Sequence, residues 1–209
     1  PGVAEEVKSS FKTLIQKLEN AGHEITYFDF PLLEQLVPAY YVLTTAEASS
    51  NLSRYTGMLY GKRSENAHDL ESTYTLSRTE GFGPEVKRRI MLGTFVLSSD
   101  HYDAYYSKAQ KVRRVIQNQT NAVLENVDAI LIPTTSTPAF KLGEKSKDPI
   151  AMYLADLFTV QANLAGNPAI SLPLFETEAG LPMGIQLMGK SFKEQELFNL
   201  SQLLIETCN

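Results

Sequence analysis

Apolar residues in the first twenty positions recur at spacings of three and four, at Val3, Val7, Phe11, Leu14, Ile15 and Leu18. This spacing predicts a helix with one buried face, and Gly22 is suited to end it. The following stretch, 23–30, is rich in apolar and aromatic residues and is closed by Pro31. Such a run predicts a strand. The chain is therefore expected to begin as a helix followed by a strand.

The rest of the chain continues this alternation of helical and strand-like patterns. Helices are predicted at 39–54 (with Pro38 in the first turn), 69–77 (capped by Asp69), 85–98, 102–125, from Asp156 to the turn at Gly166, and 193–205. Strands are predicted at 128–132, 169–172 (ended by Pro173) and 184–188. A small, polar run at 44–51 favours close approach of another backbone. Strands that alternate with helices predict an α/β fold with helices on the sheet faces.

Length and composition suit an ordinary globular protein. The chain has 209 residues, which is enough to bury a sizeable core, and a formal net charge of −5. The acidic balance argues against this chain being a main nucleic-acid-binding surface. No run approaches the roughly 18 apolar residues of a membrane span. A single cysteine, Cys208, excludes an internal disulfide and fits a reducing compartment, so we expect a cytoplasmic protein. The start at Pro1-Gly2, without an initiator methionine, indicates a fragment or a processed product.

The residues do not supply a complete catalytic set. The three histidines lie in unrelated contexts without ligands at metal spacing, and no glycine-rich phosphate loop is present. The serine pairs at 9–10, 49–50 and 98–99 lack the glycines that would expose a nucleophile and its oxyanion donors. A serine also needs an activating base. On the residues alone, the chain is interpreted as the binding portion of a larger site.

Several segments resemble the A-type subunits of the tRNA-dependent amidotransferases, which belong to the amidase-signature family. They are 40–55, 77–83, 85–95, 102–106, 163–173 and 184–189. The runs at 163–173 and 184–189 are shared across the wider family, whereas 40–54 and 85–95 are typical of the amidotransferase subunit. The resemblance covers the whole chain but only the C-terminal half of such subunits. It implies an amidase-signature fold, a mixed β-sheet with helices on both faces, of which residues 1–209 form the C-terminal portion of one domain.

The resemblance also implies an activity for the complete subunit. These subunits are glutaminases that use a Ser–cis-Ser–Lys triad in the N-terminal half, which lies outside this chain, so no catalytic residue is assigned here. The released ammonia passes to B- and C-type subunits, where Glu-tRNA(Gln), or in some organisms Asp-tRNA(Asn), is amidated. ATP and Mg²⁺ are expected on the partner subunit, with no cofactor, metal or membrane contact in this chain. Alone, the chain is expected to be inactive.

Three residues are carried over as glutamine-binding residues. Tyr40 corresponds to a wall of the pocket, Arg89 to the arginine for the α-carboxylate, and Asp156 to the acid for the α-ammonium. A zwitterionic substrate requires both a cation and an anion, and arginine offers a planar fork that matches a carboxylate. The neighbours Arg88 and Tyr41 remain alternatives, since adjacent helical residues do not face one pocket.

Structural roles compete with these assignments. Asp156, with apolar neighbours, would otherwise be an ion-pair partner or an N–H cap, because burying an isolated carboxylate is costly. Asn167 and Ser171 are interpreted as structural residues, as is a polar helix face formed by Glu47, Asn51 and Arg54. For the chain as a whole, two alternatives stay open. It is part of an amidase acting on another amide, or it is a non-catalytic interaction module.

Overall fold

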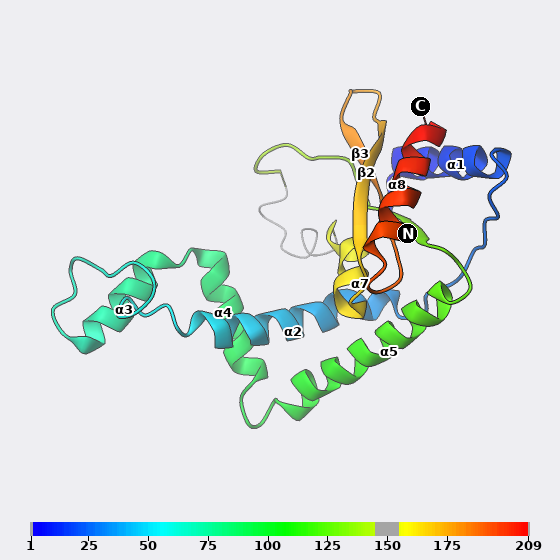
Figure 1. Ribbon diagram of the computed structural model, residues 1–209. Coiled ribbons are helices and arrows are strands. Elements are labelled where there is room, and N and C mark those ends of the chain that lie inside the picture. The colour runs from blue at the N-terminus through cyan, green and yellow to red at the C-terminus, as the bar shows by residue number, and fades with distance from the viewer. Residues whose placement is uncertain (1, 145–154, 209) are drawn as a thin grey trace. The chain divides into compact units, whose positions relative to one another are not determined.

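A computed structural model describes residues 2–144 and 155–208 (Figure 1). The chain forms two compact units. Unit 1 combines residues 1–37 with 113–209, and unit 2 consists of residues 38–112. The prediction that residues 1–209 are one portion of a single amidase-signature domain is not tested by this division and stays a prediction.

Unit 1 begins with helix α1 (Glu5–Asn20), which confirms the helix predicted from the first apolar spacing. Its buried side is formed by Val7, Leu14, Ile15 and Leu18. Gly22 follows with a φ angle of +89°, a conformation that glycine adopts without steric cost, and so ends the helix as expected.

The sheet of unit 1 has three strands: β1 (Ile130–Pro133), β2 (Ala169–Glu176) and β3 (Pro182–Met188). Their order is β1-β3-β2, and both pairings are antiparallel. The predicted strands at these three places are confirmed. However, the predicted stop at Pro173 is wrong, since β2 continues to Glu176. Proline is tolerated there because β2 is an edge strand in the described part of the sheet, and the register shifts between Pro173 and Phe175.

Helices cover both faces of this sheet. On one face, α1 and α8 (Glu194–Cys208) bring Leu14, Leu18, Leu197 and Leu204 against Ile185 and Leu187 of β3 (Figure 1). On the other face, Met188 packs with Leu124 at the end of α5 (Lys108–Leu124) and Ala162 of α7 (Leu157–Ala165). Because successive strand residues point to opposite faces, β3 is apolar along most of its length. The α/β class is confirmed, although the described strands are all antiparallel and contain none of the parallel pairs of a mixed sheet.

The predicted strand at 23–30 is wrong. These residues form no helix or strand, and no backbone ladder joins them to another described segment. Their apolar pattern indicates side chains that are partly covered, but a strand also needs a partner whose backbone lies alongside it. Within the described chain that partner is missing.

Helix α2 (Leu33–Leu52) begins six residues before the predicted start at 39 and contains Pro38 in its interior. A proline there removes one helical hydrogen bond. The extra turn buries Leu36 completely, which offsets part of that loss. The helix therefore extends upstream of the proline that was expected to begin it.

The other helices of unit 2 follow their predicted signals. Asp69 caps α3 (Leu70–Gly81) through a reciprocal pair of hydrogen bonds with Ser72, and this helix runs four residues beyond its predicted end. Helix α4 (Pro84–Val96) starts at the expected proline. A short π-helical turn, η1 (Asp103–Ser107), leads into α5, where one long helix was predicted.

Helices α2 and α4 approach each other closely at Gly93. A Cβ atom on Gly93 would lie 2.0 Å from the backbone oxygen of Thr45 and 2.6 Å from Cβ of Ser49. Beside this contact, the hydroxyls of Ser49 and Thr94 are 3.0 Å apart. The prediction that the small residues at 44–51 admit another backbone is thereby confirmed.

Replacing Gly93 by alanine should lower the free energy of unfolding by about 1–3 kcal/mol, because the new methyl group must push a backbone oxygen aside. The better helix propensity of alanine offsets only part of this loss. Gly81→Ala is the matched control, since nothing lies within 4 Å of its Cβ position. Urea unfolding followed by circular dichroism measures both variants. Equal stability of the two would contradict the close approach.

Candidate functional site

Arg89 lies on the second turn of α4 and is held by Glu85, one turn earlier. Its Nε donates to Glu85 Oε1 at 3.1 Å, and the other carboxylate oxygen of Glu85 binds Nη1 of Arg88. The two arginines differ in exposure, with 34% of the Arg89 side chain accessible against 59% for Arg88. Arg89 is thus the more enclosed member of the pair, and Glu85 fixes its orientation.

An aromatic ring covers the Arg89 guanidinium. Its Cζ atom lies 5.4 Å from the ring centre of Tyr41, within the range of a cation–π interaction. Tyr40 packs edge-on against Tyr41 with ring centres 5.5 Å apart. Partial burial lowers the pKa of Arg89. However, the Glu85 hydrogen bond and the charges of Tyr41, Glu85 and Tyr40 raise this pKa by more, so the net shift is upward.

The terminal nitrogens Nη1 and Nη2 of Arg89 make no hydrogen bond or ion pair to any residue within 2–144 or 155–208. Glu85 occupies only Nε. The guanidinium therefore presents two parallel N–H groups of the kind that bind a carboxylate in a bidentate manner. A carboxylate ligand is the partner that this arrangement suits best.

The contact between α2 and α4 explains why these side chains meet. Tyr41 lies four residues before Thr45, and Arg89 lies four residues before Gly93. Each is therefore one helical turn away from the close approach of the two backbones. Gly93 brings the helices together, and the preceding turns then place Arg89 beside Tyr41. Local spacing could reveal the Glu85–Arg89 pair, which is four residues apart, but not the pairing of these two helices.

Asp156 lies in unit 1, immediately before α7, at the N-cap position. Its backbone oxygen accepts hydrogen bonds from the amides of Thr159 and Val160 at 3.1 and 3.2 Å and from the Thr159 hydroxyl at 3.0 Å. Its carboxylate is exposed and makes no capping hydrogen bond. It also has no ion-pair partner among the described residues, so neither structural role considered for this side chain is observed there.

Asp156 is therefore not a buried acid, and the premise that it is enclosed by apolar neighbours is wrong. Two of those neighbours, Tyr153 and Leu154, lie outside the described residues. Helix α7 starts at Leu157, one residue after the predicted start, so Asp156 stands directly before the helix. Tyr40 and Arg89 belong to unit 2 and Asp156 to unit 1, so their assignment to one ligand stays a prediction.

The polar groups interpreted as structural make local contacts. Asn51 links Glu47, at 3.3 Å, to Arg54, whose Nε donates to the Asn51 backbone oxygen at 2.9 Å. The Asn167 amide donates to the Gly189 oxygen at 3.1 Å and so ties the turn before β2 to the end of β3. The Ser171 hydroxyl is hydrogen-bonded to the hydroxyl of Thr134, at 2.6 Å, and to no other side chain within the described residues. These contacts agree with structural roles.

Neither a metal cluster nor a membrane span is found in the described part of the chain. No group of three or more histidine, cysteine, aspartate or glutamate side chains gathers there in an arrangement that could hold a metal ion. No helix in the same residues is long and apolar enough to cross a lipid bilayer.

Comparison with known proteins shows the family of the chain. Residues 1–198 match the Amidase family. The A subunit of the glutamyl-tRNA(Gln) amidotransferase from Caldanaerobacter subterraneus subsp. tengcongensis is 51% identical over 200 residues, which is 96% of this chain and 41% of that protein. The protein of the same description from Nitrosococcus oceani is also 51% identical, over 201 residues. The chain thus spans about two fifths of the length of the curated relatives that it matches.

Solved structures agree with this similarity. The crystal structure of the glutamyl-tRNA(Gln) amidotransferase A subunit from Thermotoga maritima matches with a TM-score of 0.70 and 41% identity, over 96% of this chain and 38% of the other. A crystal structure described as an amidase matches with a TM-score of 0.73 over 97% of this chain and 42% of the other. Its identity is 23%, so that likeness concerns the fold alone.

Proposed function

Since the chain belongs to the Amidase family, we propose that it is part of the glutamine-hydrolysing subunit of a tRNA-dependent amidotransferase. In this proposal the chain binds glutamine, and the side-chain amide of that glutamine is hydrolysed to ammonia. A partner subunit uses the ammonia to amidate Glu-tRNA(Gln) and carries the ATP- and Mg²⁺-dependent step. The 51% identity to subunits of that description supports the choice of this activity within the family.

The observation that carries the proposal is the free guanidinium fork of Arg89. Glu85 binds only its Nε, and the ring of Tyr41 covers the group. A guanidinium fixed in this way can bind a second carboxylate, such as that of an amino acid, through its two terminal nitrogens. The α-carboxylate distinguishes free glutamine from the amides that carry no such group. We therefore assign Arg89 to the α-carboxylate.

The other two assignments complete the recognition of a zwitterion. Asp156 is proposed to bind the α-ammonium, since its carboxylate is unpaired in the described chain. Tyr40 is proposed to form a wall of the pocket. We assign the Ser–cis-Ser–Lys triad to the part of each relative that this chain does not match. The 209-residue chain alone is then expected to release no ammonia from glutamine.

A chimeric subunit tests the proposal. In it, the matching 200 residues of the Caldanaerobacter protein are replaced by this chain, and the rest of that protein supplies the triad. We expect the chimera to release ammonia from glutamine. In the presence of the other subunits, ATP and Glu-tRNA(Gln), the released ammonia should appear in Gln-tRNA. The isolated 209-residue chain is the negative control.

Two results would contradict the proposal. Ammonia release by the isolated chain well above background would mean that the chain holds its own nucleophile. A chimera that hydrolyses other amides but neither uses glutamine nor couples to the tRNA would indicate an amidase of different specificity.

A further inference from the structure

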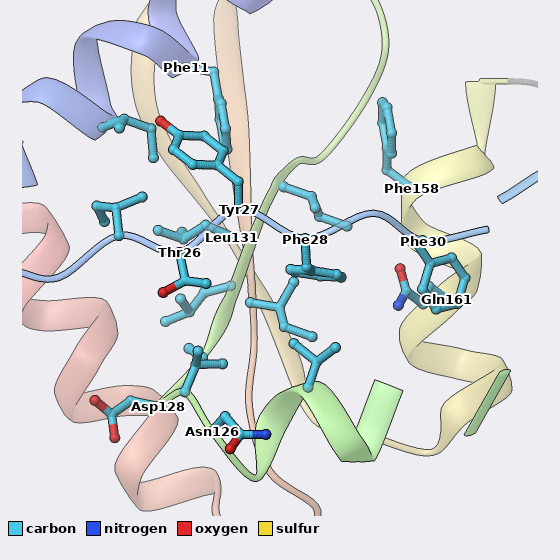
Figure 2. A pocket seen from close by; sticks show the side chains of 18 of the residues that line it. Phe11, Thr26, Tyr27, Phe28, Phe30, Asn126, Asp128, Leu131, Phe158 and Gln161 are labelled. Carbon is cyan, nitrogen blue, oxygen red and sulfur yellow. The ribbon is translucent and has the colours of Figure 1, made fainter. Parts of the chain in front are cut away.

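A large cavity in unit 1 is poorly suited to an anionic ligand. It has a volume of about 1100 Å³ and lies between the segment 23–30 and strand β1 (Figure 2). Most of its described lining is apolar, and the residues of that lining with a formal charge at neutral pH are Glu24, Asp29 and Asp128. All three are acidic, so a carboxylate would be repelled there. The arginines of α4, in unit 2, match an anionic ligand better.

Glu85 contacts both of these arginines at once. Its Oε1 accepts a hydrogen bond from Nε of Arg89 at 3.1 Å, and its Oε2 is paired with Nη1 of Arg88. Each guanidinium thus uses one oxygen of the same carboxylate. The spacings of three and four residues within α4 make both contacts possible on one helix. A single acid therefore holds the pair of arginines.

The contact with Glu85 leaves Arg89 one edge for a second carboxylate. A guanidinium offers a parallel pair of N–H groups along two edges, one formed by Nε with a terminal nitrogen and one by the two terminal nitrogens. Glu85 occupies Nε, which closes the first edge. The terminal edge stays open within the described residues. The direction from which a ligand carboxylate can approach Arg89 is thereby restricted.

Glu85 also sets the charge that a ligand meets. Two guanidinium cations and one carboxylate leave a single net positive charge at this point of α4. Lys87, the third basic residue of the run, donates from Nζ to the backbone oxygen of Thr79 at 2.7 Å and is therefore held beside the last turn of α3. The carboxylate of an amino acid carries one negative charge, whereas sulfate carries two. The net charge thus matches a monoanion.

A purely structural role for Glu85 predicts a different outcome. Glu85 lies in the first turn of α4, where the helix dipole favours an acidic side chain, and 45% of its side chain is accessible. If Glu85 only supported the helix, its loss would weaken the binding of every anion. If it matches charge, its loss would weaken the binding of a monocarboxylate but strengthen that of a dianion. The two roles therefore predict opposite changes for a dianion.

We propose that Glu85 is the specificity-determining residue of the carboxylate subsite. By holding Nε of Arg89 it leaves one pair of N–H groups for the ligand. By neutralising one of the two arginine charges it fits that pair to a monoanion and selects against dianions. The inference rests on the proposed function, because it takes the α-carboxylate of glutamine as the ligand.

The test is Glu85→Gln in the chimeric subunit, with inorganic sulfate as the dianionic probe. The substituted side chain keeps its size and one acceptor oxygen but loses the charge. The KM for glutamine should rise about fivefold with kcat nearly unchanged, since the α-carboxylate is remote from the reacting amide and is bound equally before and during the reaction. Sulfate should bind at least about fivefold more tightly, because the charges of both guanidinium groups are then uncompensated. Titration calorimetry without glutamine measures the sulfate affinity.

Glu71→Gln is the matched control. Glu71 is an exposed acid of α3 in the same unit and makes no hydrogen bond or ion pair within the described residues. Its loss changes the net charge equally without touching the arginines, so both the KM and the sulfate affinity should stay within about twofold. Adding Arg89→Ala to Glu85→Gln should abolish the gain in sulfate affinity, which shows that the sulfate binds at Arg89.

Two results would overturn this inference. Weaker binding of both glutamine and sulfate by Glu85→Gln would show that Glu85 only supports the helix. An unchanged sulfate affinity would show that Glu85 does not set the charge of the subsite. The titration needs no turnover, so it decides the role of Glu85 even where the unaltered chimera does not use glutamine and the proposed function fails.

Discussion

Replacing Arg89 by alanine in the chimeric subunit is expected to lower kcat/KM for glutamine about 10- to 150-fold. That range corresponds to the roughly 1.5–3 kcal/mol that a charged hydrogen bond contributes. The loss is expected because the two terminal nitrogens of Arg89 are held ready for a carboxylate by Glu85 and the Tyr41 ring. Arg89→Lys should restore little, since an ammonium cannot form the two parallel hydrogen bonds.

The adjacent Arg88 provides the matched control for Arg89. Both arginines contact Glu85, but Arg88 is the more exposed residue. Arg88→Ala should therefore change kcat/KM less than about threefold, as expected for an exposed ion pair. A second control uses 4-aminobutanamide, which resembles glutamine without its α-carboxylate. With this substrate, Arg89→Ala should cost little further activity. Equal losses on both substrates would mean that Arg89 supports the fold or the chemistry rather than the carboxylate.

Local sequence patterns predict well those features that depend on neighbouring residues. The spacing of Leu14, Ile15 and Leu18 determines one buried face, and α1 follows from it. The Asp69 side chain and Ser72, three residues apart, form the expected cap. The small residues at 44–51 indicate that a backbone can approach closely. They could not identify Gly93 as that partner, because it is more than forty residues away.

The two largest errors have the same physical origin. The segment 23–30 has the composition of a strand, yet strand formation depends on a backbone partner that composition does not specify. Asp156 has apolar neighbours in sequence, yet its exposure depends on where α7 begins. In both cases the side-chain pattern is local, whereas the outcome depends on where a helix or strand begins or what lies beside it.

The adjacent tyrosines of the predicted site show a related limit. Sequence spacing places Tyr40 and Tyr41 on different sides of a helix, but side chains reach beyond their own helical position. The Tyr41 ring covers Arg89, while Tyr40 packs edge-on against Tyr41. Which of the two tyrosines forms the pocket wall therefore depends on which one contacts the ligand. Comparing kcat/KM for glutamine between Tyr40→Phe and Tyr41→Phe in the chimera addresses this.

Asp156 offers a sharper test of substrate recognition, because its carboxylate has no other described role. Asp156→Asn keeps the shape of the side chain, and asparagine and aspartate are equally suited to an N-cap position, so the free energy of unfolding should not change. Its kcat/KM for glutamine should nevertheless fall by about tenfold or more, through loss of the charged contact to the α-ammonium. Steady-state ammonia release by the chimera measures kcat/KM, and urea unfolding measures the free energy of unfolding.

The size of the Asp156 effect also reports on the surroundings of the bound substrate. An ion pair that stays exposed to water contributes up to about 1 kcal/mol, or roughly fivefold, whereas a pair enclosed by the ligand contributes more. Glu178→Gln removes an exposed carboxylate from the β2–β3 turn of the same unit and should leave kcat/KM unchanged. Glutaric acid monoamide lacks the α-ammonium, so Asp156→Asn should not slow its hydrolysis further. If the loss with this amide equals the loss with glutamine, Asp156 does not bind the ammonium.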